Sequence, residues 1–112
     1  MKQDNFEFKS SEYIFIIGRN KEENFRIIDE SIQTDIWFHV KNESSCHVIL
    51  KNTNKLHDIP IQVIKRGAYL CKINSKAAKS NKSVIIYSQI KNVEKTAIMG
   101  QVLVSSYKTL NI

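Results

Sequence analysis

The chain has 112 residues, of which 42% are hydrophobic and 25% are charged. This length suits one domain with its own core, and the ordinary composition excludes wholesale disorder. Two cysteines without a CxxC spacing exclude a disulfide framework and a cysteine-rich zinc site, and they fit a reducing compartment. No apolar run approaches the roughly 20 residues of a membrane span, and the first residues lack the pattern of a secretory signal. We therefore expect a soluble, cytoplasmic protein with no membrane partner.

Lysine and arginine outnumber aspartate and glutamate by 17 to 11, and the excess is unevenly distributed. Residues 1–50 carry a net charge of −3, whereas residues 51–112 carry +9. A basic half favours a polyanionic partner, of which nucleic acid is the commonest. Ile, Lys and Asn are all abundant and all have AT-rich codons, so genome composition is an alternative source of part of the lysine excess. It does not explain why nine of the eleven acids lie in one half.

Hydrophobic periodicity predicts the elements of the first half of the chain. The continuous apolar run YIFII predicts a buried strand, and Asn20, followed by two acids, is a candidate helix N-cap. Alternation in DIWFHVK and CHVILK predicts two strands joined as a hairpin. In chain order we expect a flexible segment, a strand, a short amphipathic helix and the two hairpin strands over residues 1–12, 13–17, 20–32, 35–41 and 46–51.

The second half predicts one long helix and a closing set of strands. Apolar residues spaced three and four apart follow Pro60, and Gly67 within this stretch indicates close packing. We expect this helix, a strand, a loop and a hairpin over residues 60–78, 83–90, 90–100 and 101–112. The elements together predict an α+β fold, with a single mixed or antiparallel sheet covered on one side by one long helix and one short helix. This fold would form one domain over residues 13–112.

Motifs for catalysis or phosphate cradling do not occur in the sequence. It contains no Gly-rich phosphate loop, no HExxH and no GxSxG. Strand alternation places Cys46 and His47 on opposite faces, so these two do not join His39 in a metal site, and no fourth ligand has suitable spacing. We therefore predict no enzyme activity, no metal and no cofactor.

The aromatic pair at Trp37 admits two interpretations. Trp37 is either a core residue or, on an outward face with His39 and Lys41, a platform on which an unpaired base stacks. Asp35 alternates with Trp37 and His39, so all three project from one side of their strand. We expect them to form a hydrogen-bonded set with Arg19 or Asn24 and to hold residues 18–24 against the hairpin.

Lysines gather at the C-terminal end of the predicted long helix. Lys72, Lys76 and Lys79 are spaced four and three apart and would share one helix face. Lys82 lies just beyond them, and we expect Lys95 to join from the following loop. The stripe is either a solvated face that complements the helix dipole or a phosphate-binding ridge.

Three ordered blocks stand out: IIGRNKEEN (16–24), TDIWFHVK (34–41) and SSCHVIL (44–50). A Val-Glu-Lys stretch, a glycine and a Lys-Thr-Leu ending follow at residues 93–95, 100 and 108–110. This order resembles the RNA-binding domain of NFACT proteins, NFACT-R, over residues 13–112, although the long helix is less alanine-rich than in that family. The matching positions in the three blocks are Gly18, Arg19, Asn20, Asn24, Asp35, Trp37, Phe38, His39, Ser45, His47 and Val48.

The resemblance implies a non-catalytic RNA-binding module for tRNA or rRNA. It also implies association with the ribosome, because long members of the family bind the large subunit and tRNA during rescue of stalled translation. The N-terminal NFACT domain, the helix-hairpin-helix and the coiled coil of those members do not occur in this sequence. We therefore expect a standalone form, as the initiating Met1 also suggests, whose oligomeric state is open. The candidate RNA-binding residues are Arg19, Asn20, Asn24, Asp35, Trp37, His39, Lys41, His47, Lys72, Lys76, Lys79, Lys82 and Lys95.

A second function class remains open. A lone domain without the long NFACT scaffold could be a protein–protein interaction module that docks a ribosomal or other partner without touching RNA. The acidic first half of the chain would then form its surface.

Overall fold

The computed structural model describes all residues from 1 to 112. It contains two α-helices, three short 3₁₀-helices and eight strands. In chain order these are β1 (Lys2–Phe8), β2 (Ser11–Ile17), α1 (Lys21–Asp29), β3 (Ile36–Val40), β4 (Val48–Leu50), η1 (Leu56–Asp58), α2 (Ile61–Ile73), η2 (Lys76–Lys79), β5 (Val84–Gln89), η3 (Ile90–Asn92), β6 (Val93–Lys95), β7 (Val102–Val104) and β8 (Lys108–Asn111). No helix combines the length and the apolar character that crossing a bilayer requires.

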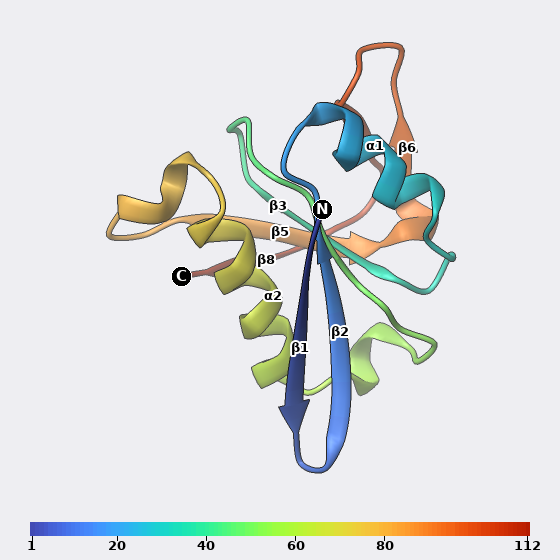
Figure 1. Cartoon of the computed structure of the whole chain (residues 1–112), viewed down its shortest axis with the longest axis vertical. Helices are drawn as coiled ribbons and strands as arrows, with labels where there is room; N and C mark the ends of the chain where they lie inside the picture. The colour runs from blue at the N-terminus through green and yellow to red at the C-terminus, as the bar shows by residue number, and fades with distance from the viewer.

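Six of the strands form one antiparallel sheet in the order β1-β2-β4-β3-β5-β8 (Figure 1). The predicted strands over residues 13–17, 35–41, 46–51 and 83–90 are confirmed, with slightly different ends, as β2, β3, β4 and β5. β6 and β7 form a separate two-stranded sheet. Part of the predicted loop over residues 90–100 is therefore a strand. The predicted hairpin over residues 101–112 is wrong, because β7 pairs with β6 and β8 pairs with β5.

The N-terminal residues form an edge strand, where the sequence predicts a flexible segment over residues 1–12. β1 pairs with β2 along its whole length, and the turn between them places Lys9 and Ser10 at φ values of 49° and 67°. Every second side chain of β1 is polar and exposed, as edge strands tolerate, and so the apolar signal is weak. Arg66 of α2 forms an ion pair with Asp4 at 2.7 Å and holds the edge down.

α2 covers one face of the six-stranded sheet and encloses the larger core. Phe38 of β3 is fully buried there, between Phe15 and Tyr87, with ring centroids 6.4 and 5.9 Å away. Gly67 of α2 lies directly over it, and a Cβ at this position would stand 2.3 Å from Phe38 Cζ. The predicted close packing at Gly67 is confirmed.

α1 and the β6–β7 hairpin cover the opposite face of the sheet, and in Figure 1 they lie together at the top, away from α2. Ile27 and Ile28 of α1 pack with Trp37, Ile49 and Ile90 in a second core. The predicted fold, a single sheet covered by helices on one side, is therefore wrong. Both faces of β3 are buried, so its alternation separates two cores and not a core from solvent.

α2 is shorter than predicted, because it ends at Ile73 and not at residue 78. The side chain of Asn74 donates to the carbonyl oxygen of Leu70 at 2.8 Å, and Ser75 Oγ donates to that of Lys72 at 3.0 Å. The Ser75 amide nitrogen also donates to the Lys72 carbonyl oxygen, at 3.2 Å, so Ser75 occupies the acceptor that the Lys76 amide would use in a continued helix. η2 follows as a separate 3₁₀ turn, so the lysines on it do not continue the face of α2.

Candidate nucleic-acid interface

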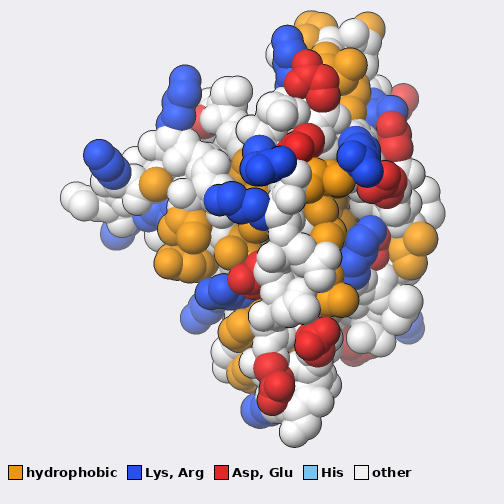
Figure 2. Space-filling view, viewed as in Figure 1, with side chains coloured by type: hydrophobic (Ala, Val, Ile, Leu, Met, Phe, Trp, Pro, Cys, Tyr) orange, Lys and Arg blue, Asp and Glu red, His pale blue; other side chains and the backbone are white.

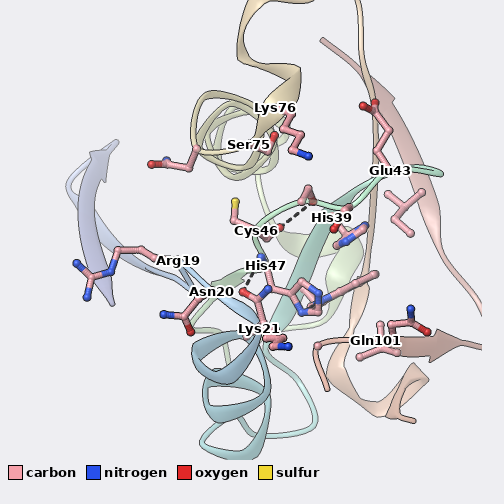
Figure 3. Close-up of a pocket in the computed structure, with 18 of the residues that line it drawn as sticks. Arg19, Asn20, Lys21, His39, Glu43, Cys46, His47, Ser75, Lys76 and Gln101 are labelled. Atoms are coloured by element: carbon pink, nitrogen blue, oxygen red, sulfur yellow. Dashed lines mark hydrogen bonds between the residues drawn. The ribbon is translucent and has the colours of Figure 1, made fainter. Parts of the chain in front are cut away.

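A hollow of about 940 Å³ opens at one end of the six-stranded sheet. Four segments meet there: the N-terminus of α1, the turn between β3 and β4, the segment that joins α2 to η2, and the β6–β7 hairpin. Figure 3 shows Lys21 on one side, Ser75 and Lys76 on the opposite side, and His47 between them. We call it the histidine hollow, because His39 and His47 both line it.

The histidine hollow collects part of the predicted RNA-binding set. Residues that line it are Arg19, Asn20, Asn24, Trp37, His39, His47 and Lys76. Residues that do not line it are Asp35, Lys41, Lys72, Lys79, Lys82 and Lys95.

The backbone of His47 is fixed by the first sequence block. The amide nitrogen of Gly18 donates to the His47 carbonyl oxygen at 2.9 Å, and the His47 amide nitrogen donates to Asn24 Oδ1 at 3.0 Å. A Cβ at Gly18 would stand 2.3 Å from that same Oδ1 atom. Gly18 and Asn24 therefore act together to hold the chain at His47 against the start of α1.

The ring of His47 is held neutral. Trp37 Nε1 lies 3.1 Å from His47 Nδ1, and because an indole N–H can only donate, Nδ1 is the acceptor. Burial, and secondarily the nearby His39, lowers the pKa of His47 to about 3. The neutral ring therefore carries its single proton on Nε2.

Trp37 is a core residue and not an exposed stacking platform. Only 1% of its surface is exposed, and it packs in the second core. His39 stacks on it with ring centroids 5.5 Å apart and an interplanar angle of 11°, and the His47 ring meets both edge-on. Burial lowers the pKa of the half-buried His39, so this ring is also neutral near pH 7.

Arg19 and Asn20 shape the N-terminus of α1. Asn20 is the predicted N-cap, because its Oδ1 accepts a hydrogen bond from the Glu23 amide nitrogen at 2.9 Å. Arg19 bonds the Glu23 carboxylate with its Nε at 3.2 Å, and this contact lowers the pKa of Glu23 to about 2. A charged partner therefore already occupies Arg19, although its side chain is 56% exposed.

Asp35 does not form the predicted set with Arg19 or Asn24. It is buried outside the hollow, where Oδ1 accepts from the Asn52 amide nitrogen at 2.8 Å and Oδ2 pairs with Lys51 Nζ at 3.1 Å. Asp35 directly precedes β3, and its partners Lys51 and Asn52 directly follow β4. Asp35 therefore does not share the contacts that Trp37 and His39 make with His47. Its role in the structure is to hold two chain connections together.

The lysines divide into those used inside the fold and those left free. Lys72 Nζ donates to the Ile112 carbonyl oxygen at 2.9 Å. Lys95 pairs with Asp29 and lies over the Phe25 ring at 5.2 Å, so the prediction that it joins the others is wrong.

Of the lysines in the predicted RNA-binding set, four near the hollow have no carboxylate partner, and we call them the lysine rim: Lys41, Lys76, Lys79 and Lys82. Lys76 lines the hollow, and Lys79 follows it on η2. The Lys41 amide nitrogen donates to the Val84 carbonyl oxygen at 2.8 Å, which brings Lys41 beside the chain at Lys82. Figure 2 shows cationic side chains projecting at the left, over the segment that carries η2.

Several lining residues were not among the predicted set, including Lys21, Ser44, Asn74 and Gln101. Lys21 and Ser44 lie within the motif blocks, and Gln101 follows the glycine at position 100, but none of these four residues was predicted to bind. Gly100 has a φ of 84°, and a Cβ there would stand 2.7 Å from Lys21 Cβ. The β6–β7 hairpin can close against α1 because this residue is glycine.

Comparison with known proteins explains the motif blocks. The family model described as the NFACT protein RNA binding domain matches residues 3–106. The chain belongs to this family. Coiled-coil domain-containing protein 25 of Bos taurus is 40% identical over 98 residues, which cover 83% of this chain and 47% of the relative. Protein JLP2 of Saccharomyces cerevisiae is 34% identical over 109 residues, which cover 90% of this chain and 51% of the relative.

The NFACT-R fold is also found in a solved structure. The C-terminal part of the fibronectin/fibrinogen-binding protein from Streptococcus suis superposes with a TM-score of 0.85 at 23% identity, over 100% of this chain and 45% of that one. At this identity the likeness shows the fold alone. The chain spans about half the length of the curated relatives it matches.

Proposed function

We propose that this NFACT-R domain is a non-catalytic module that binds tRNA or rRNA, in association with the ribosome in the cytoplasm. The observation that carries the proposal is the lysine rim, four cations without carboxylate partners beside the histidine hollow. Lysines of this kind bind phosphate as point charges and confer affinity without reading sequence. Family membership makes RNA the expected polyanion.

The histidine pair supports a binding role and not a catalytic one. Neither ring contacts a carboxylate that would orient it, and the Nδ1 atom of His47 is occupied by Trp37. Cys46, the nearest thiol in sequence, donates to the carbonyl oxygen of Cys71 at 3.4 Å. The nucleophile, base and orienting group of a hydrolytic site are not assembled here.

The salt dependence of RNA affinity tests the proposal. If the four rim lysines each neutralise one phosphate of single-stranded RNA, log K should fall against log salt with a slope of about −3. Replacing Lys76, Lys79 and Lys82 with Gln should make this slope shallower by about 2 and weaken binding to all RNA sequences alike. Fluorescence anisotropy with a labelled tRNA and a labelled single-stranded RNA gives both quantities.

The matched control replaces Lys9, Lys55 and Lys65 with Gln. These three lysines are exposed, lie outside the hollow, and carry the same total charge. The control should leave the slope within error of the parent. Equal effects of the two triple variants would show that net charge, and not the lysine rim, sets the affinity.

A protein partner is the competing outcome, and nuclease treatment separates the two. If tagged protein retains its ribosomal partners after the RNA in a lysate is digested, and the purified domain does not bind tRNA or rRNA, the RNA proposal is wrong. Partners that are lost with the RNA support it.

A further inference from the structure

The histidine hollow contains a nearly buried polar group that the fold itself does not use. His47 is 1% exposed, and its Nδ1 accepts from Trp37, so its proton is on Nε2. No protein acceptor is found for Nε2–H. No fully buried side-chain nitrogen or oxygen lacks a partner, so Nε2 must lie at the accessible surface of the hollow that His47 lines.

Apolar and aromatic side chains make up part of the lining of the hollow that contains this donor. Trp37 covers one face of the His39 ring, and the rest of this half-buried ring borders the hollow. Ile86, Val102 and Val104 also line it. The volume of about 940 Å³ lies in the range of about 300–1,000 Å³ usual for sites that enclose a small ligand.

Cations stand on both sides of the hollow and not at its floor. Lys21 lies on the α1 side and Lys76 on the opposite side, both exposed and without a carboxylate partner (Figure 3). The side chains that line the hollow therefore change with depth, from cationic at its mouth to neutral at the two histidines. A nucleotide has the same order, because its phosphate is charged and its base is neutral.

We propose that the histidine hollow takes one unstacked nucleobase of the bound RNA. Nε2–H of His47 donates to an oxygen or ring nitrogen of the base, the base lies against His39 and its apolar neighbours, and the flanking phosphates face Lys21 and Lys76. This inference rests on the proposed RNA-binding function and specifies the form of RNA. A fully paired duplex keeps its bases stacked, so it can reach only the lysines.

The neutral donor gives this proposal a signature that phosphate contacts lack. A hydrogen bond from a neutral ring releases no counterion, so its loss should lower affinity equally at every salt concentration. Loss of a rim lysine instead changes the slope.

His47→Phe is the principal variant, because it keeps a buried aromatic ring in place of the imidazole and removes the Nε2–H donor. Affinity is measured across salt for an unpaired oligonucleotide and for a blunt duplex of the same length. We expect about three- to tenfold weaker binding of the unpaired strand, an unchanged salt slope and no change for the duplex, as loss of one hydrogen bond predicts. A general loss of folding would weaken both RNAs together.

A second measurement on the wild-type chain does not depend on the variant's stability. Long-range ¹⁵N NMR spectra report the tautomer of His47 and the environment of Nε2. The unpaired oligonucleotide should shift the Nε2 resonance, and the duplex should not.

Each outcome bears on one of the two proposals. An unmoved Nε2 resonance, or equal effects of His47→Phe on both RNAs in a folded variant, overturns the base-binding inference and leaves phosphate binding intact. A wild-type chain that binds neither RNA overturns the proposed function and this inference with it.

Discussion

Acidification should destabilise the protein through His47, and the effect can be calculated from its environment. Burial lowers the pKa of His47 to about 3 in the folded state, whereas an unfolded histidine titrates near 6.5. Between these values the unfolded chain binds a proton that the folded chain does not. Stability is therefore complete above pH 6.5 and is lost as the pH falls toward 3, and the loss between pH 7 and pH 5 is about 2 kcal/mol.

Urea unfolding at pH 7 and pH 5 measures this loss, with the fluorescence of Trp37, the one tryptophan, as the signal. His39 shifts in the same direction, so the His47 contribution is isolated by comparison with His47→Gln. The variant should be less stable at pH 7, yet it should lose about 2 kcal/mol less than the parent on acidification. Equal losses in the two proteins would refute the buried neutral histidine and the tautomer argument built on it.

Two substitutions test the packing that positions the hollow. Gly67→Ala should destabilise the fold by about 2 kcal/mol, because overpacking against the buried ring of Phe38 costs about 3 kcal/mol and the gain in helix propensity returns about 1 kcal/mol. Thermal unfolding measures this loss and should show none for the control Lys65→Ala, whose side chain is exposed. Asp35→Ala should lower the free energy of unfolding by about 2–4 kcal/mol, because it leaves the backbone amides of Asn52 and Ile32 without an acceptor, while the folded variant should keep its RNA affinity. A stability within error of the parent, measured by thermal unfolding, would contradict this role.

The motif blocks predicted the centre of the candidate site from the sequence. They included Asn24, His39 and His47, which the fold brings to one hollow, and the acids after Asn20 separately predicted its role as a helix cap. Local chemistry alone did not predict that Trp37 would orient His47. Alternation shows which residues share a face of a strand, but the pairing of Trp37 Nε1 with the ring of His47, which directly precedes β4, depends on register.

Elements whose stability comes from distant partners were predicted less well. β1 reads as polar because it lies at the edge of the sheet, and it is held by Arg66, 62 positions away from Asp4. The stop of α2 at Ile73 depends on Asn74 and Ser75, residues that helices also contain in their interiors. Lys95 was expected near the other lysines, but the β6–β7 hairpin carries it to Asp29 of α1.

Backbone amide NMR shifts on titration with an unpaired RNA test the central claim most directly, namely that the RNA surface is the histidine hollow and its lysine rim. The largest shifts should fall on residues 19–24, 39–47, 74–82 and 99–104, where the four segments meet. The outer face of α2 at Lys65 and Tyr69 should remain unchanged. Shifts concentrated on that face or on the β1–β2 turn, or no shifts with tRNA or single-stranded RNA at low salt, would contradict the assignment.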